Sequence, residues 1–256
     1  GWFFRTSPSD ARQGQVLADI AISRGQTDMA VTYTNNDYGK GLADAFASAY
    51  EAVGGTITVM SGHEDDKADY SADVAALSAG GSSTLAVLGY ADTGGKGIIA
   101  ASEDTGAFTD YVFADGMIST TTSGAIGDGS WGTLPAPSGA LAANWLSVAE
   151  AGGVDGTGAY SAESYDAMAL IILASQAAGS TDRAAIQAQV MNVANAPGIQ
   201  CSAGGLGDCL KWISGGLVVD YVGATGVEFT AVGEGKGSYA EKEVIGGAFS
   251  TVASHE

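Results

Sequence analysis

Three side chains that could bind a small ligand each lie at the end of a stretch that predicts a buried β-strand. Tyr38 follows the apolar run 29–34, Tyr90 follows the run 84–89, and Asp115 ends the run 111–115. The carboxyl ends of parallel strands meet at one edge of a sheet, where open α/β sheets bind their ligands. Aromatic rings beside a single carboxylate suit a small ligand that has a cationic group and an apolar part.

Each of these residues also has a purely structural interpretation. Tyr38 could cover the start of the helix that follows it, and Tyr90 could pack against a neighbouring loop. Asp115 could cap the next segment of the chain. Periodicity alone leaves both interpretations open, and with them the question of why a bulky tyrosine stands on the turn at residue 38.

The motifs of common enzyme classes are incomplete in this sequence. The stretch GYADTGGKG has Tyr90 where a phosphate-binding loop needs its first glycine, and neither Ser nor Thr follows Lys96. The stretch GDGSWG has Asp128, not glycine, two residues before Ser130, so it is not a nucleophile elbow. We therefore do not expect an enzyme, and nothing in these motifs predicts a cofactor.

The two histidines offer little to a catalytic or metal site. His255 lies beside the end of the chain, where side chains are usually mobile. His63 lies in the polar stretch SGHEDDKAD, whose spacing is not that of a calcium loop. We expect this stretch to be a solvated acidic turn and predict no metal site.

Composition narrows the possible partners. The 256 residues carry ten Lys and Arg against 29 Asp and Glu, for a formal charge of -19. Such a surface repels a polyphosphate backbone, so we do not expect a nucleic-acid partner. The longest apolar run, residues 167–174, is too short to cross a membrane. The first ten residues lack the features of a signal peptide, so we expect a mature, processed or truncated N-terminus, and the last residues resemble a natural end.

Cys201 and Cys209 are the two cysteines of the chain, separated by a Gly-rich stretch. Without histidines nearby they do not form a zinc site. Either they are free thiols or they form a disulfide, which we favour because disulfides persist mainly in exported proteins.

The fold class follows from the order of the periodic patterns. Strands are expected over 29–34, 56–61, 84–89 and 111–115, and helices over 11–24, 39–53, 94–103 and from about residue 70. This alternation predicts an α/β fold with a parallel sheet flanked by helices. Beyond the Pro-rich stretch 134–139, helical patterns dominate over 141–151, 162–178 and 182–193, with short β-like pieces after Pro197. These helices have few strands to cover, which leaves apolar helix faces without a partner. We therefore expect another chain or an absent N-terminal segment to pack against them.

Five stretches in order carry a resemblance to a known family: FFRTSPSDARQG, NNDYGKGLADAF, DYSADVAAL, YSAESYDAMAL and DYVGATGVEF. Together the sequence resembles the type I periplasmic binding proteins of branched-chain amino acid ABC transporters. The resemblance implies two lobes that close on a ligand in the cleft, one of them complete (residues 7–133 and 239–256). The other is a mainly helical remainder (residues 134–238), because the N-terminal third of the family's sequence, which forms most of the first lobe's sheet, is absent.

The resemblance also implies a function and a set of binding residues. It implies a periplasmic receptor that binds an amino acid, branched-chain or otherwise apolar, and delivers it to an ABC permease in the membrane. Tyr38 and Tyr90 match aromatic residues that line the cleft, Asp115 matches an acidic residue that receives the ligand's ammonium group, and Tyr160 matches an aromatic that reaches the cleft from the other lobe. Two alternatives stay open: a ligand-sensing module of a signalling receptor, and a binder of amides, urea or aromatic acids.

Overall fold

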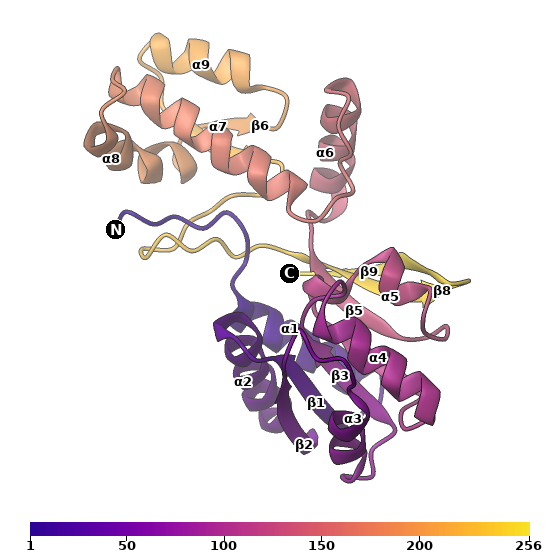
Figure 1. Cartoon of the computed structure of the whole chain (residues 1–256). Coiled ribbons are helices and arrows are strands. Elements are labelled where there is room, and N and C mark those ends of the chain that lie inside the picture. Colours follow the sequence, from indigo (N-terminus) through magenta and orange to yellow (C-terminus); the bar gives the residue numbers. More distant parts are fainter. The chain divides into compact units, whose positions relative to one another are not determined.

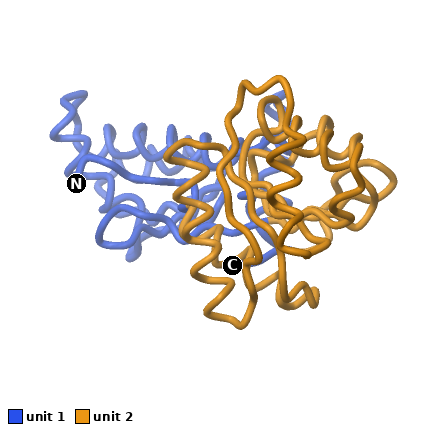
Figure 2. Tube along the Cα trace, turned by 60° about the horizontal axis from the view of Figure 1, so that its bottom comes forward, with its two compact units in different colours: residues 1–9, 135–239, 254–256 blue, residues 10–134, 240–253 orange.

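The structure, a computed structural model, describes all residues 1–256 and divides the chain into two compact units (Figure 2). Unit 1 consists of residues 1–9, 135–239 and 254–256, and unit 2 of residues 10–134 and 240–253. The lobes expected from the sequence divide the chain at similar points, and their assignment as receptor lobes stays a prediction. None of the helices combines the length and apolar character that crossing a membrane requires.

A seven-stranded sheet forms the centre of unit 2 (Figure 1). Its strands, in their order across the sheet, are β2 (Thr56–His63), β1 (Asp28–Thr34), β3 (Thr84–Leu88), β4 (Asp110–Phe113), β5 (Trp131–Pro135), β8 (Tyr239–Ile245) and β9 (Ala248–His255). The pairs from β2 to β5 are parallel, as the alternating pattern predicted. Every residue of β3 is buried, which is typical of a strand covered on both faces.

Helices cover both faces of this sheet. They are α1 (Asp10–Ser23), α2 (Asp37–Ala52), α3 (Ser71–Ser78), α4 (Gly94–Thr105) and the short α5 (Thr120–Ser123). The chain passes from β1 to β2 in one direction across the sheet and from β2 to β3 to β4 in the other. Because such crossovers are right-handed, α2 lies on one face and α3 and α4 lie on the other.

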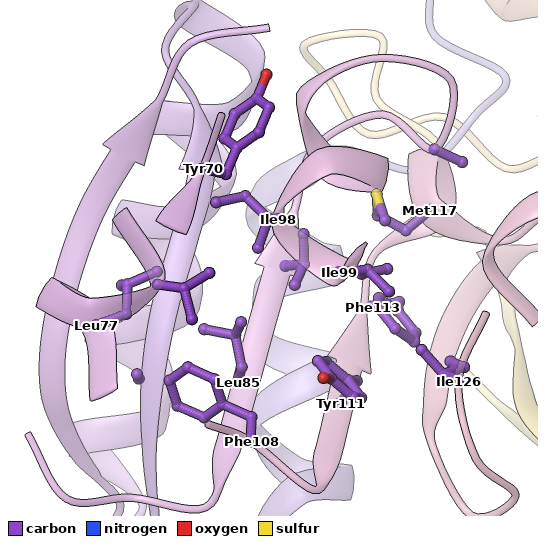
Figure 3. Packing of buried hydrophobic residues seen from close by; sticks show 14 of the residues in the cluster. Tyr70, Leu77, Leu85, Ile98, Ile99, Phe108, Tyr111, Phe113, Met117 and Ile126 are labelled. Atoms are coloured by element: carbon purple, nitrogen blue, oxygen red, sulfur yellow. The ribbon is translucent and has the colours of Figure 1, made fainter. Parts of the chain in front are cut away.

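One hydrophobic core fills the space between the sheet and the helices α3 and α4 (Figure 3). Leu85 and Val87 of β3 meet Leu77 of α3 and Ile98 of α4 in this core, and all four are at most 1% exposed. A buried aliphatic side chain of this kind stabilises the fold by about 1.5–3 kcal/mol relative to leaving it in water. The core thus fixes the strand ends and the loops that follow them.

Two details of unit 2 differ from the sequence prediction. The fourth strand ends at Phe113 and does not reach residue 115, where a single 3-10 turn, η1 (Asp115–Met117), begins. The strand β5 was not predicted, since its last two residues, Leu134 and Pro135, open the Pro-rich stretch 134–139 that read as a break. The strands β8 and β9 are joined by Gly246 and Gly247, whose positive φ angles of 62° and 78° suit a tight hairpin turn.

Unit 1 is mainly helical. It contains α6 (Gly139–Ala151), α7 (Ser161–Ala178), α8 (Arg183–Ala194) and α9 (Leu206–Ser214), with β6 (Ile199–Ser202) and β7 (Val219–Gly223) as a two-stranded parallel sheet. The disulfide between Cys201 and Cys209, with Cα atoms 5.9 Å apart, joins β6 to α9 and confirms the favoured pairing. Apolar side chains of α7 are exposed, among them Met168 at 58% and Ile171 at 50%.

Two features of this region differ from the sequence analysis. The helix α9 was not predicted, and its apolar residues pack in the core with Tyr221. The stretch 226–233 was expected to contain a β-like piece, and the structure has only an isolated bridge there, between Phe229 and Gly235.

Candidate functional site

The strand order of unit 2 creates a topological switch point at the carboxyl edge of its sheet. The strands β1 and β3 are neighbours, yet the chain leaves β1 toward α2 and leaves β3 toward α4, on opposite faces of the sheet. Two loops that depart in opposite directions mark a topological switch point, which is where open α/β sheets bind their ligands. Tyr38 lies in the first turn of α2, directly after the first of these loops, and Tyr90 lies in the second loop.

The start of α2 places Tyr38 at this edge. Asn36 caps the helix, and its side-chain oxygen accepts a hydrogen bond from the backbone N–H of Gly39 at 2.9 Å. Gly39 has to lack a side chain, because a Cβ there would lie 2.2 Å from the carbonyl oxygen of Thr34. The helix therefore begins directly against the end of β1, and Tyr38 is held in its first turn.

Tyr90 follows Gly89 at the end of β3 and stacks on Tyr38. The two ring centroids are 5.2 Å apart with an angle of 27° between the ring planes. Aromatic pairs in contact contribute about 0.5–1.5 kcal/mol beyond the area they bury. Tyr90 is 38% exposed, so part of its surface that Tyr38 does not cover is accessible to a ligand.

Asp115 completes the group. The hydroxyl of Tyr38 donates a hydrogen bond to Oδ1 of Asp115 at 3.3 Å. Burial raises the pKa of Tyr38 far above its usual value, and the negative charge of Asp115 raises it further, so the hydroxyl remains a donor. Gly116 permits the close approach, because a Cβ there would lie 2.4 Å from the carbonyl oxygen of Gly89 and 3.3 Å from the Tyr38 hydroxyl.

The structure thus brings together the three residues that the sequence placed at one sheet edge. A half-buried carboxylate next to two stacked rings can attract a cationic group and offer an apolar surface beside it. The bulk of Tyr38, unusual on a strand-to-helix turn, serves both the ring stack and the hydrogen bond to Asp115.

Tyr160 belongs to unit 1 and lies directly before α7. Its φ of 59° makes it the one non-glycine residue with a left-handed backbone, and its side chain is 36% exposed. The match of Tyr160 to a ligand-binding aromatic stays a prediction from the resemblance.

The sequence prediction for the stretch after β2 was wrong in one respect. His63 is not on a solvated turn: it is the last residue of β2, is 1% exposed, and shares a hydrogen bond of 2.8 Å between its Nδ1 and the hydroxyl of Thr32. Asp65 is half-buried and accepts hydrogen bonds from Thr34 at the end of β1 and from Thr93 directly before α4. This stretch directly follows a predicted strand and so lies at the same sheet edge as Tyr38 and Tyr90. Its position could have indicated a role at the site, but the run of charges favoured a solvated turn.

Comparison with known proteins identifies the family. Residues 1–200 match the family described as periplasmic binding protein. The chain belongs to this family. The Leu/Ile/Val-binding protein homolog 3 of Brucella melitensis is 28% identical over 195 residues, which are 74% of this chain and 52% of that protein. The chain therefore spans about half the length of the curated relative it matches.

Solved structures of this family share the fold. The leucine-binding protein LivK of Thermotoga maritima has a TM-score of 0.73 at 21% identity, covering 99% of this chain and 67% of that one. LivJ of Streptococcus pneumoniae, in complex with isoleucine, has a TM-score of 0.70 at 17% identity, covering 96% and 65%. A solute-binding protein of R. palustris in complex with benzoate has a TM-score of 0.70 at 14% identity, covering 98% and 64%. The α/β fold with helices on a mainly parallel sheet is thus the type I periplasmic binding protein fold, as the sequence predicted.

Proposed function

We propose that this periplasmic binding protein is the extracytoplasmic solute receptor of an ABC importer and that its solute is an apolar amino acid. The observation that carries the proposal is the group formed by Tyr38, Tyr90 and Asp115 at the switch point of the sheet. Asp115 would receive the ammonium group of the amino acid, and the exposed face of Tyr90 would pack against its apolar part. The solute would then pass to a membrane permease.

Relatives of known structure support an amino-acid ligand. LivJ of Streptococcus pneumoniae holds isoleucine, and a substrate-binding protein of Desulfitobacterium hafniense, with a TM-score of 0.65 at 20% identity, holds leucine. A zwitterion needs an anionic partner for its ammonium group, and Asp115 has this charge beside an aromatic wall.

A second candidate solute is an aromatic acid. Two R. palustris neighbours of similar fold hold benzoate and 4-hydroxybenzoate. Stacked tyrosines suit an aromatic ring, but such acids carry a carboxylate and lack an ammonium group. The carboxylate of Asp115 would repel a second anion in its neighbourhood, and so favours the amino acid.

Isothermal titration calorimetry with L-leucine, L-isoleucine and benzoate tests the proposal, using Asp115→Asn to remove the charge. We expect the wild-type protein to bind the amino acids, and Asp115→Asn to weaken that binding by about 2–5 kcal/mol, as for loss of one partner of a buried charge pair. Asp104→Asn, on the exposed far end of α4, removes the same charge away from the site and should change nothing. Binding of benzoate alone, or an unchanged amino-acid affinity in Asp115→Asn, would contradict the proposal.

A further inference from the structure

Asp65 joins two segments next to the stacked tyrosines, one just before Tyr38 and one just after Tyr90. Its Oδ2 accepts a hydrogen bond from the hydroxyl of Thr34 at 2.7 Å. Its Oδ1 accepts hydrogen bonds from the hydroxyl of Thr93 at 2.9 Å and from the backbone N–H of Gly94 at 3.3 Å. One carboxylate therefore links the end of β1 to the start of α4.

The position of these partners relates Asp65 to the site. Thr34 is four residues before Tyr38, and Thr93 is three residues after Tyr90. The loops leave on opposite faces of the sheet, so no ladder hydrogen bond holds one to the other beyond the strand ends. We propose that Asp65 is a positioning residue that fixes the spacing of Tyr38 and Tyr90 before a ligand arrives. The inference rests on the proposed function, since it assigns Asp65 a part in preparing that site.

The turn that carries Asp65 is itself held in place. The hydroxyl of Tyr70, a residue buried in the core, lies 2.7 Å from the carbonyl oxygen of Glu64 and 3.0 Å from that of Asp65. The side-chain N–H of Asn35 donates to Oε1 of Glu64 at 2.6 Å, which adds a second link to the loop after β1. Because this turn is already ordered, its carboxylate can bind its partners with little further loss of conformational entropy.

Close packing beneath Asp65 limits how far the loops can move apart. A Cβ on Gly94 would lie 2.7 Å from Cδ2 of His63, 2.8 Å from the carbonyl oxygen of Glu64 and 3.0 Å from Oδ1 of Asp65. A Cβ on Gly89, the residue before Tyr90, would lie 3.2 Å from Nε2 of His63. The loop that carries Tyr90 therefore packs against the buried ring of His63.

The charge of Asp65 suits this task. Partial burial raises its pKa, but the hydrogen bonds from Thr34, Thr93 and Gly94 outweigh that effect and leave the pKa below its usual value. The ionised carboxylate also faces the N-terminal end of α4, where the helix dipole favours a negative charge. The side chain of Thr93, at the N-cap, makes no capping bond of its own, so Asp65 supplies one.

Nuclear magnetic resonance of the ligand-free protein tests the spacing directly. We expect nuclear Overhauser effects between the ring protons of Tyr38 and Tyr90 in the wild-type protein, because the centroids are 5.2 Å apart. Asp65→Ala should abolish them and speed hydrogen exchange of the Gly94 amide. Asp65→Asn keeps one acceptor oxygen, so we expect weaker Overhauser effects than in the wild type and an exchange rate of the Gly94 amide between those of the wild type and Asp65→Ala. Asp66→Asn, an exposed neighbour that loses the same charge, should match the wild type.

Calorimetry with L-leucine then measures the effect on binding. We expect Asp65→Ala to lower the affinity by about tenfold, since the site would have to be ordered on binding, and Asp65→Asn to lower it less. Ring contacts that persist in Asp65→Ala would overturn the positioning role. A wild-type protein that binds no ligand, while its ring contacts still depend on Asp65, would overturn the proposed function and leave the positioning role standing.

Discussion

At the scale of single residues, Tyr160 carries strain that its surroundings have to offset. A left-handed backbone costs an ordinary residue about 1–2 kcal/mol, and glycine adopts it at little cost. Tyr160 has φ 59° and ψ 13° directly before α7. Strained residues that persist in a fold often have a functional task, and the family resemblance supplies one in ligand binding.

The strain leads to a prediction for Tyr160→Gly. We expect the free energy of unfolding to stay within about 1 kcal/mol of the wild type or to rise, because the relief of strain offsets the greater freedom of glycine in the unfolded chain. We also expect a weaker affinity for L-leucine. Urea unfolding and calorimetry measure the two quantities. A large loss of stability would show instead that the ring of Tyr160 holds unit 1 together.

The sequence predicted some residues of the site and missed others for identifiable reasons. Tyr38, Tyr90 and Asp115 follow strands, so the rule on strand ends was enough to group them. Asp65 and His63 stand in a run of charges, which usually indicates a solvated segment. Their hydrogen bonds go to Thr32 and Thr34 of β1, which lie 31 residues earlier in the chain. Periodicity carries no information about such distant partners.

At the scale of elements, a buried tyrosine near the end of α2 binds the helix to the loop that precedes β1. Tyr50 is fully buried, its ring stacks on Phe46 with centroids 5.3 Å apart, and its hydroxyl donates to the carbonyl oxygen of Gln26 at 2.7 Å. Burial, with a smaller contribution from the charge of Asp28, raises the pKa of Tyr50 to about 12.

This pKa predicts a loss of stability in alkali. In the unfolded chain a tyrosine ionises near pH 10, so the stabilisation by Tyr50 is complete below about pH 10 and is lost as the pH rises toward 12. Urea unfolding of the wild type and of Tyr50→Phe, followed by circular dichroism between pH 8 and pH 11, checks it. We expect a shallower decline in Tyr50→Phe, and equal slopes would contradict the assignment.

The elements themselves were predicted unevenly. The long helices α2 and α7 begin and end close to their predicted bounds. A stripe of apolar residues marks the length of α2, and a long apolar run without proline marks α7. The strand β5 was missed since Pro135 and the prolines nearby read as a break, although proline is tolerated at a strand end. The helix α9 was missed because the glycines between the two cysteines weaken a helical pattern.

At the scale of the whole molecule, the formal charge of -19 opposes the folded state through self-repulsion. Salt screens charges over about 8–10 Å at physiological ionic strength. We therefore expect the melting temperature at pH 7 to rise with sodium chloride, by about 2–4 °C for each kcal/mol of repulsion that is screened. Differential scanning calorimetry measures the rise.

The control for this prediction is the acid range. The isoelectric point of the sequence is near pH 4.1, where the net charge vanishes. The same salt series at that pH should leave the melting temperature nearly constant. A rise of equal size at both pH values would assign the effect to salting-out and not to the charge of the folded chain.

The sheet of unit 2 draws its strands from two distant stretches of the chain. The strands β1 to β5 precede residues 136–238, and β8 and β9 follow them. During translation, a ribosome therefore has to make nearly all of unit 1 before the unpaired edge of β5 meets its neighbour. The sheet of unit 2 can therefore begin to fold early but can be completed only after unit 1 has been synthesised. Until then the nascent chain exposes the unpaired edge of β5, and this is when it most needs a chaperone.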